Sequence, residues 1–204
     1  MQWRMLGRRG RYASWTIVGD EAQSSWPYPA ESAAARKAAL EGKPEHAFRL
    51  STNYRNSAEI YDLAAKVAQV GVPHPDLADA VRRTGDQPVH LTVDAADVVT
   101  TVIRSADDIL DRVEGTVAIV APTARLADLG EQLASLLEQH SDRLRLLDGL
   151  DTKGLEFDGV VVIEPDGITA ESSAGWRTLY VVLTRGTQLL TTVGTTDRWL
   201  TRIA

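Results

Sequence analysis

Residues 116–147 read TVAIVAPTARLADLGEQLASLLEQHSDRLRLL, and they decide the fold class because strand-like and helix-like patterns follow one another in them. Residues 116–121 are almost wholly apolar, as expected of a strand that is covered on both faces. Thr123 is placed to cap the next helix, whose leucines recur at helical spacing, and residues 143–147 form the next strand. A strand, a helix and a strand in this order are typical of a parallel α/β sheet.

The same alternation extends over the rest of the chain. The other expected strands are residues 15–18, 46–50, 89–93, 160–163 and 188–193. The other expected helices are residues 31–40, 56–70, 98–113 and 176–185. Asn56 and Glu59 resemble a capping box, and Gly71 ends their helix. Residues 72–85 are expected to form a loop or linker, and a domain boundary is expected near residues 45–55.

The length and composition are those of an ordinary globular protein. The 204 residues amount to one large domain, or to one domain and part of another, with 44% hydrophobic and 25% charged residues. Cysteine is absent, which excludes disulfides, thiolate metal ligands and cysteine nucleophiles. No apolar run approaches the ~20 residues of a membrane span, and the arginine-rich N-terminus does not resemble a signal peptide. We therefore expect a cytoplasmic protein that does not bind membranes.

The formal net charge of −6 is unevenly distributed. Residues 1–85 carry a net charge of +3, residues 86–171 carry −12, and residues 172–204 carry +3. The net charge alone argues against a general nucleic-acid-binding protein. The distribution keeps that class open, because two basic ends could face a polyanion while the acidic middle faces water.

Four polar segments at expected strand ends are the candidate chemical sites. They are residues 19–23 (GDEAQ), 50–55 (LSTNYR), 151–158 (DTKGLEFD) and 177–185 (RTLYVVLTR). Ligands of open α/β sheets bind outside the carboxyl ends of the strands. A glutamine amide can donate to a phosphate, and an arginine beside an aromatic ring can hold a phosphate while the ring stacks on a base. Taken alone, each segment could also be an ordinary surface turn, a helix-entry loop or a helix end.

Taken together and in this order, the four segments resemble motifs of the UvrD/Rep family of superfamily-1 helicases. Residues 19–23 look like motif III, residues 50–55 like motif IV, residues 153–158 like motif V and residues 179–185 like motif VI. The resemblance spans residues 15–190 and implies a RecA-like parallel sheet flanked by helices. Residues 46–204 would then be the second motor domain, of the 2A type, and residues 1–45 would be a remnant of the first.

The resemblance also implies roles for individual residues. The ATP-binding residues that it implies are Asp20, Gln23, Tyr54, Arg55, Gly154, Glu156 and Arg185. Arg55 and Arg185 would contact the γ-phosphate and Gln23 would sense it, so these three are the candidate catalytic residues. Tyr54 would stack on adenine and Glu156 would bind the ribose. An arginine that faces a transferred phosphoryl group can be worth ~10³–10⁵ in rate.

Two parts of an ATPase site are missing from the sequence. No Gly-x-x-x-x-Gly-Lys-[Ser/Thr] segment occurs, and Gly42-Lys43 is followed by Pro44 rather than by a hydroxyl residue. No Asp-Glu pair, which binds Mg²⁺ and activates water in the family, precedes motif III. The resemblance therefore implies the C-terminal part of a longer ATPase, with the magnesium ligands in the missing N-terminal part. We expect no metal site in this chain and no ATP hydrolysis by the chain alone.

The evidence for nucleic-acid binding is mixed. The family places aromatic residues that stack on single-stranded DNA just after motif III, and Trp26 and Tyr28 have that spacing. Such stacking is worth ~1–3 kcal/mol per base. However, Pro29 stands where an arginine is expected, and residues 148–150 (DGL) replace the Thr-x-His that normally precedes motif V. Lost polar and phosphate contacts should weaken DNA binding, and the two aromatic rings could instead pack in their loop.

These departures favour one branch of the family. Residues 1–9 (MQWRMLGRR), which lead into the motif III segment, resemble the HelD-type factors, UvrD-like ATPases that dissociate and recycle bacterial RNA polymerase. We therefore expect part of an ATP-driven motor with RNA polymerase as its partner. A helicase that translocates along single-stranded DNA and opens duplex DNA is the alternative. A non-catalytic interaction module is the alternative of another class, and the oligomeric state stays open.

Overall fold

The computed structural model describes residues 2–9, 14–20, 22–23, 29–40 and 42–204, and its centre is a five-stranded parallel sheet. The strand order is β3-β7-β6-β4-β5. In the register, Val117 of β4 lies beside Leu144 of β5 and Gly159 of β6. Parallel strands that are joined through helices confirm the expected α/β class, a parallel sheet flanked by helices.

The elements follow the expected alternation. The strands are β1 (Thr52–Ser57), β2 (Asp79–Arg82), β3 (Val89–Thr92), β4 (Val117–Ala121), β5 (Leu144–Asp148), β6 (Phe157–Ile163) and β7 (Gly186–Gly194). The helices are α1 (Gln2–Arg9), α2 (Pro29–Leu40), α3 (Ala58–Gly71), α4 (Val98–Arg112), α5 (Leu126–Gln132), α6 (Ala134–Gln139), α7 (Pro165–Ala170), α8 (Gly175–Leu183) and α9 (Arg198–Ile203), with 3-10 turns η1 (Ala95–Asp97) and η2 (Thr123–Arg125). None of the described helices is long and apolar enough to cross a membrane.

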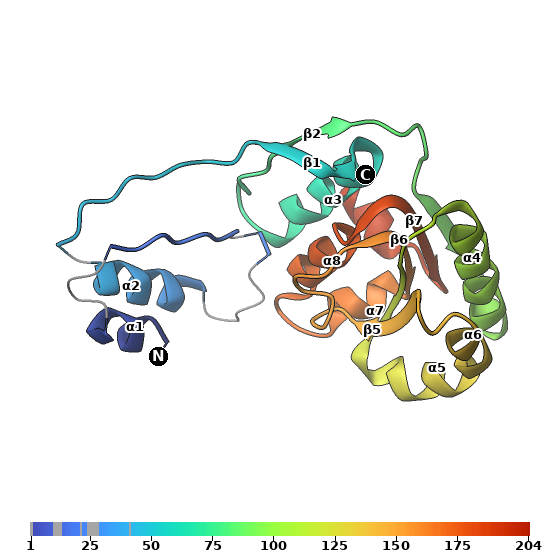
Figure 1. Ribbon diagram of the computed structural model, residues 1–204. Coiled ribbons are helices and arrows are strands. Elements are labelled where there is room, and N and C mark those ends of the chain that lie inside the picture. The colour runs from blue at the N-terminus through green and yellow to red at the C-terminus, as the bar shows by residue number, and fades with distance from the viewer. Residues whose placement is uncertain (1, 10–13, 21, 24–28, 41) are drawn as a thin grey trace.

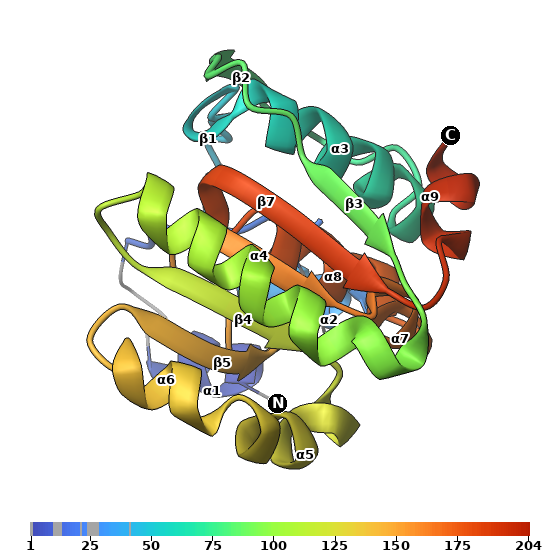
Figure 2. The same cartoon turned by 90° about the vertical axis from the view of Figure 1, so that its right-hand side faces the viewer.

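Both faces of the sheet are covered, which explains the fully apolar strands. Val117 and Ile119 of β4 belong to a buried cluster with side chains of α4, α5 and α6, and Figure 2 looks onto the face that carries α4. Ala118 and Val120 point the other way and pack with side chains of α3, α8 and α9. Successive side chains of a strand alternate between faces, so a strand between two helical layers must be apolar throughout.

Two expected strands do not form. Residues 15–18 and 46–50 lie in segments that pair with no strand among the described residues, and Val18, Phe48 and Leu50 are exposed. A strand needs a neighbour to bond its backbone N–H and C=O groups, and apolar periodicity alone does not supply one. Figure 1 shows α1 and α2 side by side, joined to the sheet by the extended chain that leads into β1.

A second sheet replaces part of the predicted helix and linker. β1 pairs in parallel with β2, so residues 53–56 lie in a strand and residues 72–85 contain a strand as well as loops. Residues 56–57, which were expected in a helix, therefore end this strand, and α3 begins after them.

The predicted helix caps were also wrong. Ser57, rather than Asn56, caps α3, because its Oγ accepts a hydrogen bond from the backbone N–H of Ile60 at 3.4 Å. The Glu59 carboxylate accepts instead from the backbone N–H groups of Thr84 and Gly85, at 3.3 and 3.0 Å. Thr123 makes no capping bond, because it lies in η2, which follows Pro122.

Candidate functional site

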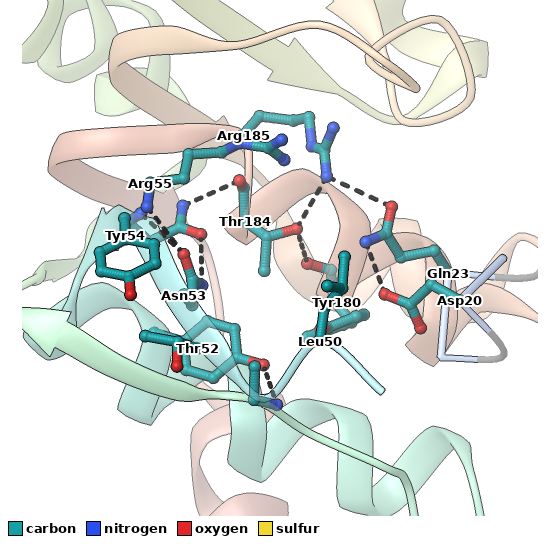
Figure 3. Close-up of a pocket in the computed structure, with 13 residues that line it drawn as sticks. Asp20, Gln23, Leu50, Thr52, Asn53, Tyr54, Arg55, Tyr180, Thr184 and Arg185 are labelled. Atoms are coloured by element: carbon teal, nitrogen blue, oxygen red, sulfur yellow. Dashed lines mark hydrogen bonds between the residues drawn. The ribbon is translucent and has the colours of Figure 1, made fainter. Parts of the chain in front are cut away.

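A pocket of about 410 Å³ lies where Asp20 and Gln23, β1 and the C-terminal end of α8 meet (Figure 3). Its lining residues are Asp20, Gln23, Leu50, Thr52, Asn53, Tyr54, Arg55, Asn56, Tyr61, Ala78, Tyr180, Thr184 and Arg185. Residues of three of the four candidate segments, 19–23, 50–55 and 177–185, therefore share one pocket although they lie far apart in the sequence. A larger hollow of about 580 Å³ beside Gln69 and residues 73–75 has no carboxylate, lysine or arginine in its lining.

Arg185 is the buried anchor of this pocket, with 2% of its surface exposed. Its Nε donates to the Val181 carbonyl at 3.0 Å, and Nη1 donates to the Leu155 carbonyl at 3.1 Å. These carbonyls, one of them in the last turn of α8, favour a cation. Burial lowers the pKa of Arg185, and the positive charge of Arg55 lowers that pKa further. A guanidinium nevertheless stays protonated in proteins, so Arg185 is a fixed positive charge in the pocket wall.

Arg55 reaches the pocket from β1 and is less constrained. Its Nε pairs with Oε1 of Glu156 at 2.7 Å, and both side chains are about half exposed. The Asn53 side-chain oxygen accepts from the backbone N–H groups of Arg55 and Asn56, at 2.9 and 3.2 Å, and so shapes this part of the strand. The Tyr54 ring is 72% exposed at the rim, where a flat ligand could stack on it.

Asn56 is a structural member of the site that sequence reasoning missed. Its side chain is 2% exposed, and Nδ2 donates to the carbonyls of Thr184 and Gly186, at 2.9 and 2.7 Å. These two residues flank Arg185, so Asn56 links the two arginine-bearing segments. The sequence signal that could have found it was Ser57, a good helix cap that leaves Asn56 without a capping role.

Gln23 and Asp20 close the pocket on the side of Arg185. Gln23 Nε2 donates to the Asp20 carboxylate at 2.6 Å, and Gln23 Oε1 accepts from Arg185 Nη2 at 3.4 Å (Figure 3). The amide group of Gln23 is thereby oriented between an acid and a buried cation. Trp26 and Tyr28, the expected nucleic-acid-binding residues, lie outside the described residues.

The two candidate residues of the segment 151–158 contribute unequally. Glu156 reaches the site through its ion pair with Arg55. Gly154 does not line the pocket, although its φ of +84° is a conformation that glycine adopts without strain.

The site lies at the amino ends of the strands, where we expected the carboxyl ends. Glu156 directly precedes β6 and Arg185 directly precedes β7. Each connection between two parallel strands runs from the carboxyl end of one strand back to the amino end of the next. Glu156 and Arg185 are the last residues of two such connections, so both lie at the amino edge of the sheet. Arg185 accordingly donates to a carbonyl in the last turn of α8.

The pocket combines positive charge with aromatic rings. Figure 3 shows the guanidinium groups of Arg55 and Arg185 on the same side of the pocket. Tyr61 and Tyr180 line another part of it, and burial and the neighbouring Tyr61 raise the pKa of Tyr180, which stays neutral. Two guanidinium groups and a flat ring suit a ligand that carries phosphates and an aromatic base. Within the described ranges, no three His, Asp or Glu side chains come together as a metal site.

Comparison with known proteins supports the fold. No family model and no curated protein matches the sequence. Among solved structures, the chain is similar to the crystal structure of the C-terminal domain of a possible DNA helicase from Lactobacillus plantarum WCFS1, with a TM-score of 0.52 and 21% identity over 74% of this chain and 94% of that one. The chain therefore shares the fold of that domain.

Proposed function

We propose that this chain contains the second motor domain of a UvrD-like ATPase and presents Arg55 and Arg185 to the γ-phosphate of ATP. The observation that carries the proposal is the meeting of two guanidinium groups, from β1 and from the end of α8, in one pocket. Like charges repel, so such a pair is stable where an anion of high charge binds between or beside them. In the proposal, residues 1–45 belong to the first motor domain and residues 46–204 form the second.

The contacts assign a task to each residue in nucleotide binding. Arg185 is held by three carbonyl and hydroxyl oxygens and is preorganised, whereas Arg55 must leave Glu156 to reach a phosphate. The released Glu156 carboxylate would accept from the ribose hydroxyls, and the exposed Tyr54 ring would stack on adenine. Gln23 would orient the attacking water or the γ-phosphate with its amide.

Hydrolysis needs further parts. The sequence has no Gly-x-x-x-x-Gly-Lys-[Ser/Thr] segment, so we assign the phosphate-binding loop and the magnesium ligands to another domain. Both arginines lie on this chain, so ATP would draw the two domains together and phosphate release would let them part. That cycle is the proposed mechanical step.

The proposed partner of the motor is bacterial RNA polymerase, as the resemblance of residues 1–9 to HelD-type factors implies. DNA is the alternative partner, and it is favoured by the similarity in fold to a possible DNA helicase. The non-catalytic alternative does not explain why Gln23, Arg55 and Arg185 line the same pocket.

The proposal is tested by nucleotide discrimination. We expect fluorescently labelled ATPγS to bind the purified chain more tightly than labelled ADP, because its extra phosphate meets the two arginines. Arg55→Ala and Arg185→Lys should each reduce that preference about tenfold in anisotropy titrations. Arg145→Ala, at an exposed arginine of β5 outside the pocket, is the matched control and should leave the preference unchanged.

Two results would contradict the proposal. The first is equal affinity of the wild-type chain for ATPγS and ADP. The second is a preference for ATPγS that survives both arginine substitutions.

A further inference from the structure

A third arginine joins the two segments that carry Arg55 and Arg185. Arg82 is the last residue of β2, and its Nη2 donates to the carbonyl of Arg55 itself at 2.7 Å. The same nitrogen donates to the carbonyl of Thr187, two residues after Arg185. One guanidinium nitrogen thus holds the backbones of both arginine-bearing segments.

The arrangement is unusual for an arginine near the surface. Within the described part of the chain, no carboxylate forms an ion pair with Arg82, and its Nε is buried without a hydrogen-bond partner. A buried donor without an acceptor is unfavourable and calls for an explanation. The explanation that the contacts offer is that the Arg82 side chain is oriented by its two carbonyl acceptors rather than by an acid.

These bonds connect two separate sheets. β1 and β2 form the two-stranded sheet, whereas Thr187 belongs to β7 of the five-stranded sheet. Asn56 makes a second link between the two sheets, because its side chain donates to the carbonyls of the residues on either side of Arg185. The distance between Arg55 and Arg185 therefore depends on side-chain bonds and not on a continuous ladder of backbone bonds.

The strand that carries Arg82 is itself held in place. The backbone N–H groups of Thr84 and Gly85, just beyond β2, donate to the carboxylate of Glu59 in α3. The Arg82 side chain therefore extends from a strand end that is fixed in place. Its guanidinium can hold the backbone of Arg55 against the electrostatic repulsion between Arg55 and Arg185.

We propose that Arg82 is a positioning residue that holds Arg55 at a set distance from Arg185 and thereby tunes the preference of the pocket for a terminal phosphate. The proposal rests on the proposed function for the identity of the ligand. A ligand that contacts two guanidinium groups at once needs both at the correct separation. Greater mobility of Arg55 therefore lowers the affinity for the triphosphate more than the affinity for the diphosphate.

The test compares Arg82→Met, which keeps the unbranched stem, with Arg82→Lys, which restores a cationic donor. Arg83→Met, at the exposed neighbour, is the matched control. The first readout is the side-chain Nε–H signal of Arg55 in nucleotide-free protein by ¹⁵N NMR, assigned by its loss in Arg55→Ala. The second readout is the ratio of ATPγS to ADP affinity, and urea denaturation reports whether each variant folds.

We expect Arg82→Met to shift the Arg55 signal and to reduce the ATPγS preference about five- to tenfold, with the ADP affinity unchanged. Arg82→Lys should recover part of both, and Arg83→Met should change neither. If Arg82→Met does not fold, Arg82→Lys alone decides by the same two readouts.

The proposal is overturned if folded Arg82→Met leaves the Arg55 signal in place, or if it weakens ATPγS and ADP binding equally, as general damage to the pocket would. If the wild-type chain shows no preference for ATPγS, the proposed function fails. The Arg55 signal then still decides whether Arg82 positions Arg55.

Discussion

The Arg55 side chain forms an ion pair with Glu156, the residue expected to bind the ribose of the nucleotide. Both side chains are about half exposed, and an ion pair of that kind contributes only ~0–1 kcal/mol. A phosphate with more than one negative charge can therefore displace the carboxylate. In the proposed function, Glu156 is therefore an exchangeable partner that neutralises Arg55 and gives way to a more highly charged anion.

This view predicts the effect of removing the carboxylate. Glu156→Gln should raise the affinity of the chain for inorganic tripolyphosphate about two- to fivefold, because Arg55 no longer has to leave an anionic partner. Tripolyphosphate has no ribose, so the loss of a ribose contact does not mask the gain. Isothermal titration calorimetry at low ionic strength measures the change.

Glu138→Gln alters the net charge equally at an exposed position outside the pocket, so it is the control and should have little effect. An unchanged or lower affinity in Glu156→Gln would show that the Glu156 carboxylate does not compete with the anion.

Among the elements, α8 matters most for the site, because Arg185 follows it directly. Its first residue, Gly175, has no room for a side chain, since a Cβ there would meet the backbone carbonyl of Thr169 at the end of α7. Backbone cannot yield as a flexible side chain can. The close approach of α7 and α8 therefore fixes where α8 begins.

Two glycine substitutions separate this packing constraint from helix propensity. Gly175→Ala should lower the free energy of unfolding by about 1–3 kcal/mol, because the new methyl group forces α8 away from α7. Gly130→Ala, in α5, meets only Leu146 Cδ2 at 4.0 Å and should raise it by about 0.5–1 kcal/mol. Urea denaturation of both variants gives the two values, and effects of the same sign would refute the packing argument.

For the whole molecule, the separation of charge matters more than the net charge of −6. Six of the 18 acidic residues in the segment 86–171 lie on α4, α5 and α6, and Asp97 and Glu114 lie next to the ends of α4. These helices cover the face of the sheet opposite α3 and α8. The arginine pocket lies beside α3 and α8. Anion binding in the pocket is thus compatible with an acidic protein.

The choice between the two proposed partners is made with the whole chain. We expect the immobilised chain to retain purified bacterial RNA polymerase. We expect it to bind single-stranded DNA weakly at physiological salt, because Pro29 and Asp148 stand where the family that the chain resembles has cationic or polar residues. Strong DNA binding that is lost in the double variant Trp26→Ala, Tyr28→Ala would instead establish the DNA-translocating alternative.

Much of the fold could be predicted because burial leaves a local mark on sequence. The all-apolar β4 and the amphipathic α4 were found within one or two residues of their ends. The strands expected at residues 15–18 and 46–50 failed because periodicity reports which residues would be covered but not whether a neighbouring strand is present. For the site, the sequence indicated Gln23, Arg55 and Arg185, and the structure places all three in one pocket.

By itself, the sequence determined the α/β class, the order of most elements, the lack of cysteine chemistry and the segments that carry the arginines. Only the tertiary structure decided that the site lies at the amino ends of β6 and β7, and that Asn56 and Arg82 join its halves. The physical reason is the separation along the sequence over which each kind of interaction acts. Periodicity and helix signals act over a few residues, whereas Asn56 bonds to a carbonyl 128 residues away, and only the packing of α3, α8 and β7 brings the two together.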